Sequence, residues 1–211
     1  MTRPSLRDQA YQVIKQSILD GSYPEGALLT ERTLAERFSM SRTPIRTAVD
    51  RLESEGYLQS SPNRGIRVRE MSLRQVLDFF DFRLALEPYA VDRLAAIHLS
   101  AEDSFLMLQN LDAQDVCVQA RDFIRFTALD SEFHLLLVRL YGNQEMVQTM
   151  EHLQDKLFRM ALNVLKKDPA RIHQSALDHR AVWTAVAAGD GSTAADLLRN
   201  HLEYGKRILV K

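Results

Sequence analysis

The chain has 211 residues, of which 26% are charged and 45% are hydrophobic, and its formal net charge is −1. This length predicts one large or two small domains, and the composition is ordinary for a globular protein. The near-zero charge excludes a basic footprint along the whole chain, so any nucleic-acid contact has to be local.

The distribution of charge and the cysteine count indicate where the protein works and what it can bind. Residues 1–70 hold 11 Lys and Arg against 9 Asp and Glu, whereas the remainder holds 16 against 19, a mild asymmetry that fits a DNA-binding head on an acidic body. Cys117 is the only cysteine, so no intrachain disulfide is expected. No apolar run approaches a membrane span of about 18 residues, and we expect a cytoplasmic protein without a membrane partner.

The N-terminal segment predicts a helix, a turn and then a helical hairpin. Leu6 to Leu19 carries apolar residues at helical spacing, and Gly21 stops the pattern before a turn rich in Pro and Gly. Between Thr30 and Gly56 we expect two short helices, with Ser41 as the N-cap of the second and Pro44 in its first turn. The buried face of the second helix is predicted from the spacing of Ile45, Ala48, Val49 and Leu52.

The opposite face of this second helix carries polar side chains. Arg42, Thr43 and Arg46 lie at its N-terminal end, and Arg32 lies at the start of the preceding helix. In a helix-turn-helix these positions reach base edges in the major groove, and Arg can pair with guanine O6 and N7. The alternative is a solvated helical hairpin with ordinary surface arginines.

A hairpin is expected to follow the second helix. Tyr57 to Gln59 and Ile66 to Arg69 read as short strands, separated by a turn cluster, Ser60 to Gly65. Helices followed by such a hairpin predict a winged helix-turn-helix. The tip, Asn63 to Gly65, is either a DNA-contacting wing or a plain surface turn.

Residues 6–70 resemble the DNA-binding domain of the GntR family of bacterial transcription regulators. The resemblance is carried chiefly by L-A-E-R-F at residues 34–38 and S-R-T-P-I-R at residues 41–46, with Pro24, Glu31, Gly56 and Gly65. It implies a DNA-binding domain over residues 1–70. The residues expected to contact DNA are Arg32, Ser41, Arg42, Thr43, Arg46, Arg64 and Gly65.

The rest of the chain reads as helix throughout. Ser72 can cap a long helix with Val76, Leu77, Phe80, Leu84 and Tyr89 as candidate core positions. Helices are expected near residues 72–97, 101–115, 119–140, 144–166, 168–188 and 190–209. The fold class is therefore mainly α, a winged helix-turn-helix followed by an all-α helical bundle over residues 71–211.

Two polar residues interrupt an apolar stretch of this bundle. Asp130 and His134 are four residues apart, so both point to one helix face. Burying them is costly unless they hydrogen-bond to each other or bind a metal. His179 and His201 lie in apolar contexts on later helices, and three imidazoles with one carboxylate suit Zn²⁺ or another divalent transition metal. His98, His152 and His173 lack such a context and are expected at the surface or at helix ends.

Residues 72–209 resemble the FCD effector domain of the FadR subgroup. The resemblance rests on Arg83 with Glu87, D-S-E-F-H at residues 130–134, Asp178-His179, Gly189-Asp190 and His201-Leu202. It implies a dimeric helical bundle that holds a divalent metal, Zn²⁺ by default and Ni²⁺, Mn²⁺ or Fe²⁺ otherwise, on Asp130, His134, His179 and His201. It further implies a small carboxylate effector beside the metal.

Arginines are the candidate partners for that carboxylate. A guanidinium grips a carboxylate bidentately, and Arg83 is the first candidate. The alternative is an ordinary surface pair between Arg83 and Glu87, four residues apart. Arg159 is a weaker candidate, since a solvated arginine would fit its position equally well.

The leading hypothesis is a homodimeric repressor that binds a near-palindromic operator and responds to a small organic acid. A direct metal sensor, with the metal as the signal, is the second hypothesis. A metal-dependent enzyme is the third; it lacks a general base beside the four ligands and leaves the helix-turn-helix unexplained.

Overall fold

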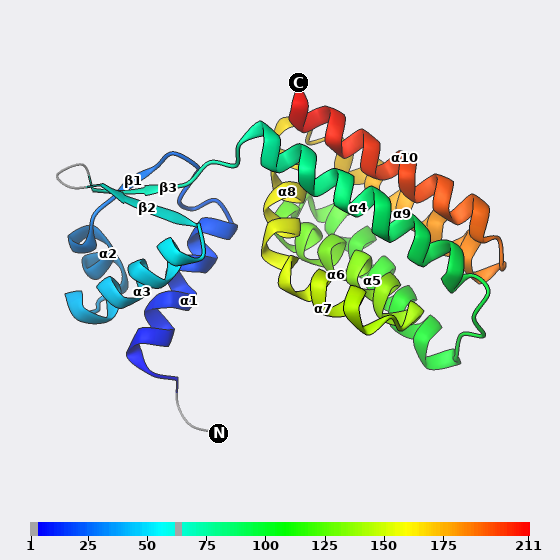
Figure 1. The fold of residues 1–211 in the computed structure, drawn as a ribbon, viewed down its shortest axis with the longest axis horizontal. Coiled ribbons are helices and arrows are strands. Elements are labelled where there is room, and N and C mark those ends of the chain that lie inside the picture. Colours follow the sequence, from blue (N-terminus) through cyan, green and yellow to red (C-terminus); the bar gives the residue numbers. More distant parts are fainter. Residues whose placement is uncertain (1–3, 62–64) are drawn as a thin grey trace. The chain divides into compact units, whose positions relative to one another are not determined.

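The computed structural model describes residues 4–61 and 65–211, and the chain divides into two compact units, Met1–Met71 and Ser72–Lys211. Figure 1 traces both units. None of the described helices combines the length and the apolar character needed to cross a membrane.

The first unit is a winged helix-turn-helix. Its helices are α1 (Leu6–Leu19), α2 (Glu31–Phe38) and α3 (Arg42–Ser54), and its strands are β1 (Leu28–Leu29), β2 (Leu58–Ser61) and β3 (Gly65–Val68). The strands form an antiparallel sheet in the order β1-β3-β2. Leu58 pairs with Val68 and Ser61 with Gly65, so the hairpin strands begin and end one or two residues away from the predicted bounds.

The ends of α2 and the start of α3 differ in how they are capped. Thr30 accepts a hydrogen bond from the Thr33 N–H, and Ser39 adopts a left-handed conformation with φ 52° that ends α2. Ser41 occupies the N-cap position of α3 as expected, but its side chain makes no capping hydrogen bond. The reason is Pro44: it stands at the third helical position, where the N–H that an N-cap oxygen usually accepts from is missing.

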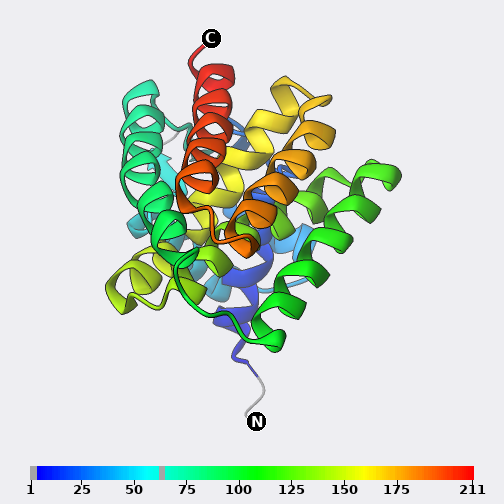
Figure 2. The same ribbon diagram turned by 90° about the vertical axis from the view of Figure 1, so that its right-hand side faces the viewer.

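The second unit is an all-helical bundle. Figure 2 shows α4 and α10 side by side, as their contacts require. The helices are α4 (Leu73–Leu94), α5 (Ala101–Ala120), α6 (Phe123–Tyr141), α7 (Gln144–His152), α8 (Gln154–Lys167), α9 (Arg171–Ala187) and α10 (Gly191–Val210).

Two sequence predictions for this unit were wrong. The single helix expected over residues 144–166 is two helices that meet at Leu153, where no Gly or Pro announces the break. Tyr89 is 48% exposed rather than buried, because the core face of α4 runs through Phe80, Arg83 and Glu87. Tyr89 instead packs edge-on against Tyr141.

The core of the bundle brings aromatic side chains against the polar residues of interest. Phe133, Trp183 and Leu202 are buried in one apolar cluster that draws on α4, α5, α6, α9 and α10. Gly205 on α10 permits a close approach to α4, since a Cβ there would lie 3.4 Å from the Phe80 ring. These contacts hold α6, α9 and α10 in the register that brings their histidines together.

Candidate metal centre and nucleic-acid interface

Four side chains from three helices converge in the interior of the bundle. Asp130 and His134 come from α6, His179 from α9 and His201 from α10. Each offers one ligand atom, and these atoms all lie within 4.8 Å of one another. Sequence spacing predicted that Asp130 and His134 share a face; the packing of α9 and α10 supplies the other two.

The inner nitrogens of the cluster lack ordinary partners. His179 Nε2 lies 3.4 Å from His201 Nε2 and 3.5 Å from Asp130 Oδ1. His134 Nε2 is buried without a hydrogen-bond partner within the described part of the chain. A buried, unpaired nitrogen is costly, so this arrangement fits a bound cation better than a closed hydrogen-bond network.

Each histidine is oriented by a hydrogen bond at its outer nitrogen. Nδ1 of His134 lies 2.6 Å from Glu87 Oε2, Nδ1 of His179 lies 2.8 Å from Gln114 Oε1, and Nδ1 of His201 lies 3.1 Å from Asp178 Oδ2. The acceptor oxygens of Glu87 and Gln114 place the proton on Nδ1 of His134 and His179 and leave a lone pair on their Nε2 atoms. Nδ1 of His201 lies 3.1 Å from an acceptor, Asp178 Oδ2, and 3.1 Å from a donor, Arg171 Nη2. This outer shell is characteristic of metal-ligating histidines.

The protonation states match this arrangement. Burial lowers the pKa of His134 and His201, and lowers that of His179 well below its usual value, which leaves the imidazoles neutral. Burial also raises the pKa of Asp130. Burial alone would raise the pKa of Glu87 too, but the charge of Arg83 and the hydrogen bonds from His134 and Arg83 bring it to about 2. Neutral imidazoles with one carboxylate are a donor set for a divalent transition metal.

The structure contradicts the hydrogen bond between Asp130 and His134 that the sequence left open as an alternative to metal binding. No hydrogen bond joins Asp130 to His134 among the described residues; His134 bonds Glu87 instead. The surface-pair alternative for Arg83 fails as well. Arg83 does pair with Glu87, with Nε 2.5 Å from Oε1, but Arg83 is only 4% exposed and Glu87 is fully buried.

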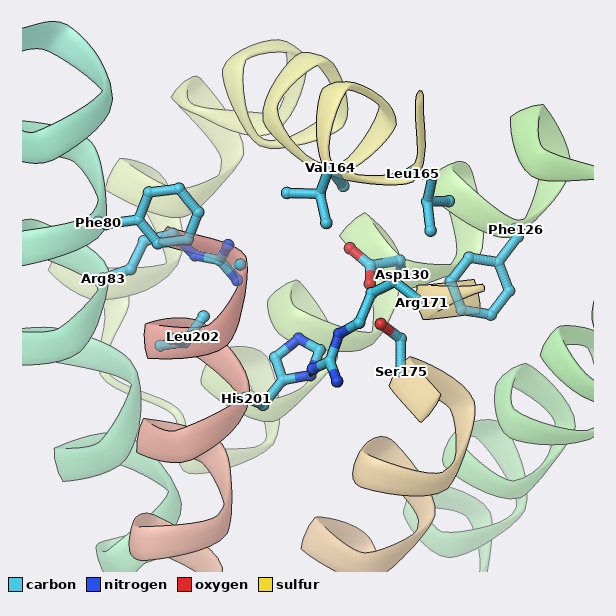
Figure 3. Close-up of a pocket in the computed structure, with 12 residues that line it drawn as sticks. Phe80, Arg83, Phe126, Asp130, Val164, Leu165, Arg171, Ser175, His201 and Leu202 are labelled. Carbon is cyan, nitrogen blue, oxygen red and sulfur yellow. The ribbon is translucent and has the colours of Figure 1, made fainter. Parts of the chain in front are cut away.

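A cavity with a volume of about 40 Å³ lies beside the cluster and includes Asp130 and His201 in its wall. Figure 3 shows Arg83 entering from α4, and Arg171 and Ser175 from α9. Apolar side chains complete the wall: Phe80, Phe126, Ala161, Val164, Leu165 and Leu202, with Gly205.

Sequence reasoning missed two of these polar wall residues. Arg171 donates to Asp178 Oδ2 at 2.6 Å, which also steadies the carboxylate behind His201. Ser175 is 5% exposed, and its hydroxyl has no hydrogen-bond partner in the part of the chain that is described. Both precede His179 on α9 at steps of four residues, a spacing that would have placed them on its face. Arg159 is buried rather than solvated, and it does not line this cavity.

The candidate DNA contacts lie on the exposed face of α3 and the start of α2. Ser41, Arg42, Thr43 and Arg46 are all exposed. Arg32 is also exposed, and its Nε lies 3.9 Å from Oε1 of Glu36. Thr47, which the sequence reading did not single out, shares this face.

At the wing, Arg64 falls outside the described residues, and Gly65 begins β3 with φ 85°. A Cβ at Gly65 would lie 2.8 Å from the Leu29 carbonyl oxygen, so the close approach of β1 requires glycine here.

Family models match both units. The model for bacterial regulatory proteins of the gntR family matches residues 6–68, and the FCD domain model matches residues 78–204. Among curated relatives, the HTH-type transcriptional repressor RspR of Escherichia coli K12 is 28% identical over 96% of this chain and 87% of its own length. The Nta operon transcriptional regulator of Aminobacter aminovorans is 31% identical over 63% of this chain and 62% of its own length.

Solved structures share the fold. Escherichia coli McbR/YncC superposes with a TM-score of 0.77 at 22% identity, over 98% of both chains. Lar of Listeria monocytogenes gives 0.65 at 16% identity, over 99% of this chain and 98% of its own. The gntR family, RspR and the Nta operon regulator are transcription regulators rather than enzymes. The chain belongs to the gntR family of bacterial regulatory proteins with an FCD domain, and it is a DNA-binding transcriptional regulator.

Proposed function

We propose that the protein is a cytoplasmic, homodimeric repressor whose operator binding is controlled by a small carboxylate bound beside a divalent metal. One observation carries this proposal: three imidazole Nε2 atoms and Asp130 converge, while each Nδ1 is held by an outer acceptor. A purely structural set of buried histidines would not be expected to leave His134 Nε2 in the interior without a partner among the described residues. RspR, a related repressor, supports the sign of regulation.

The head domain, residues 1–70, reads DNA in this proposal. Two copies in a dimer bind the half-sites of a near-palindromic operator. The exposed residues of α3, with Arg32 on α2, enter or border the major groove, while Arg64 and Gly65 belong to the wing.

The effector domain, residues 71–211, holds the ligands. Asp130, His134, His179 and His201 hold the metal, which is Zn²⁺ by default, with Ni²⁺, Mn²⁺ or Fe²⁺ as alternatives. Bound there, a divalent metal supplies a positive centre that a carboxylate oxygen can ligate.

The cavity wall supplies the other contacts to the effector. Arg83 offers the guanidinium edge not used by Glu87, and the Ser175 hydroxyl offers a hydrogen bond. Arg159, the weaker candidate from the sequence, lies on α8 outside the wall of this cavity.

Helix α4 provides the route from effector to DNA. It carries Arg83 and Glu87, and its first residue, Leu73, follows the end of β3 by five residues of chain. An effector that changes the Arg83–Glu87–His134 contacts therefore acts on the helix that continues from the wing. Coupling of this kind typically changes affinity by about 5- to 150-fold.

Calorimetric titration of small hydroxy and sugar acids into metal-loaded protein tests the proposal. A matched pair of variants, His134→Ala in the cluster and the exposed His173→Ala on the same domain, separates specific from general effects. We expect a binding acid whose affinity is lost in His134→Ala and kept in His173→Ala. Metal bound at full occupancy with no binding acid would instead favour direct metal sensing, because the four ligands need no organic partner.

A further inference from the structure

The candidate DNA-reading face contains one pre-formed ion pair between its two helices. Arg46 Nε on α3 donates to Glu31 Oε1 at 2.9 Å, and Arg46 Nη2 donates to Glu31 Oε2 at 3.0 Å. This is a bidentate fork, and it lies within a single compact unit. The Arg46 side chain is 66% exposed and that of Glu31 is 30% exposed, so the pair sits at the surface with solvent access on one side.

The geometry of the fork leaves a defined set of donors free. A guanidinium has five N–H donors, and two adjacent edges can each engage a bidentate acceptor. Glu31 takes the Nε–Nη2 edge, so the end-on edge formed by Nη1 and Nη2 still has N–H groups directed away from the carboxylate. That end-on edge matches the O6 and N7 acceptors of guanine in the major groove.

We propose that Arg46 reads a guanine in each operator half-site and that Glu31 is the residue that positions it for this purpose. The inference rests on the proposed DNA-reading role of α3. In it, Glu31 does not touch DNA; it holds the guanidinium plane so that the free edge faces the groove.

Charge favours base reading over phosphate binding for Arg46. Glu31 neutralises the Arg46 charge and presents a carboxylate that repels phosphate, so the pair is poorly suited to a backbone contact. A base edge is neutral, and recognition there depends on the direction of the N–H groups rather than on net charge. Arg42, by contrast, is exposed, and although its charge acts on Glu31, it makes no hydrogen bond or salt bridge with another described residue, so its guanidinium remains available for phosphate.

Glu31 is held in place by the capped start of α2. Thr30 caps α2 and places Glu31 in the first turn, where the helix dipole favours a carboxylate. Beneath Arg46, Ile45 and Val49 are buried in the core that α1 and α2 share with α3. Holding the side chain before DNA arrives reduces the conformational entropy lost on binding and sharpens discrimination.

Selection from a pool of random duplex DNA tests this with the full-length protein. Wild type should enrich a motif with a guanine at one position of each half-site, preferred about 5- to 150-fold over other bases. Glu31→Ala should lose this preference at that position by about tenfold or more while the other positions stay unchanged. Asp50→Ala is the matched control: like Glu31→Ala it removes one carboxylate whose charge acts on Arg46, but Asp50 lies on α3 and makes no hydrogen bond to Arg46 within the described residues.

The outcomes separate the inference from the function on which it rests. A wild-type motif that Glu31→Ala leaves intact, or a uniform gain in affinity for every duplex, overturns the role of Glu31. Uniform weakening by Arg46→Ala across all sequences would assign Arg46 to phosphate and overturn guanine reading. Enrichment of no duplex at all by wild type overturns the DNA-reading role of α3 and this inference with it. Circular dichroism melts of each variant confirm that the domain is folded.

Discussion

His134 Nδ1 lies 2.6 Å from Glu87 Oε2, and the same carboxylate accepts the guanidinium of Arg83. Glu87 therefore joins a candidate metal ligand on α6 to a candidate effector contact on its own helix, α4. It fixes the tautomer of the imidazole and neutralises a buried arginine at once. A single buried carboxylate thus connects the two proposed ligand sites.

Replacing Glu87 by Gln should weaken metal binding and also destabilise the folded bundle. The amide oxygen still accepts from His134 but, being neutral, makes the imidazole a less basic ligand, so metal affinity should fall by about 10- to 100-fold. Arg83 would keep its charge in the interior without a counter-ion, which should lower the free energy of unfolding by on the order of 3 kcal/mol. Competition with a fluorescent chelator and denaturant unfolding measure the two effects. Glu145→Gln, an exposed change on α7, should alter neither; unaltered metal affinity in Glu87→Gln would contradict this role.

Removing the metal should destabilise the effector domain. At a metal concentration about 100 times the Kd, binding stabilises the folded state by about 2.7 kcal/mol. A shift of about 5–10 °C in Tm between metal-loaded and chelator-treated protein is expected for a domain of this size. Differential scanning calorimetry with elemental analysis checks this. In His134→Ala the two preparations should melt together, whereas a wild-type protein indifferent to chelator would argue against a metal in the cluster.

Ser175→Ala should act on the effector alone. Its hydroxyl faces the cavity and makes no hydrogen bond among the described residues, so removing it leaves no protein partner unsatisfied. A lost hydrogen bond to a charged ligand costs about 1.5–3 kcal/mol, which corresponds to a roughly 10- to 150-fold weaker Kd. Calorimetry with the acid identified by titration measures the change, and metal content should be unchanged. Ser104→Ala on α5 serves as the control, and equal acid affinity in both variants would remove Ser175 from the site.

Replacing Arg42 and Arg46 together by Ala should abolish sequence-specific DNA binding while the fold survives. Both side chains are exposed on α3, and the core beneath them, including Ile45 and Leu52, is untouched. Fluorescence anisotropy with the duplex enriched by the wild type is the measurement, and a thermal melt confirms folding. Retained affinity for that duplex would exclude α3 as the recognition helix.

Gly65→Ala should destabilise the winged unit by more than Gly142→Ala destabilises the bundle. Both glycines have positive φ, 85° and 87°, so both substitutions incur backbone strain of about 1 kcal/mol. Only at Gly65 does the new Cβ also meet a backbone atom, the Leu29 carbonyl oxygen at 2.8 Å, whereas nothing lies within 4 Å at Gly142. Chemical denaturation followed by circular dichroism compares them. Equal losses would mean that β1 moves aside without cost.

Local pattern accounts for much of the fold. The spacing of Ile45, Ala48, Val49 and Leu52 predicted the buried face of α3, and all four are buried. The sequence pattern did not predict helix ends at positions where no Gly or Pro marks the end of a helix. Leu153 separates α7 from α8, and Arg121 ends α5 in a left-handed conformation, φ 53°, although neither is a typical stop signal. Backbone geometry at such points is set by packing rather than by the residue itself.

The sequence by itself determined which residues could serve at the candidate sites: the Asp130–His134 spacing, two further histidines in apolar contexts, and the arginines at the start of α3. Only the tertiary structure decided their partners. Glu87, which only the alternative for Arg83 placed at the surface, is buried against His134. Gln114 and Asp178 orient the other two histidines, and Glu31 on α2 pairs with Arg46 on α3. The physical reason is that sequence periodicity acts over a few residues, whereas these contacts join residues on different helices. Periodicity specifies which side of a helix a residue faces, whereas a hydrogen-bond partner on another helix depends on how the helices pack.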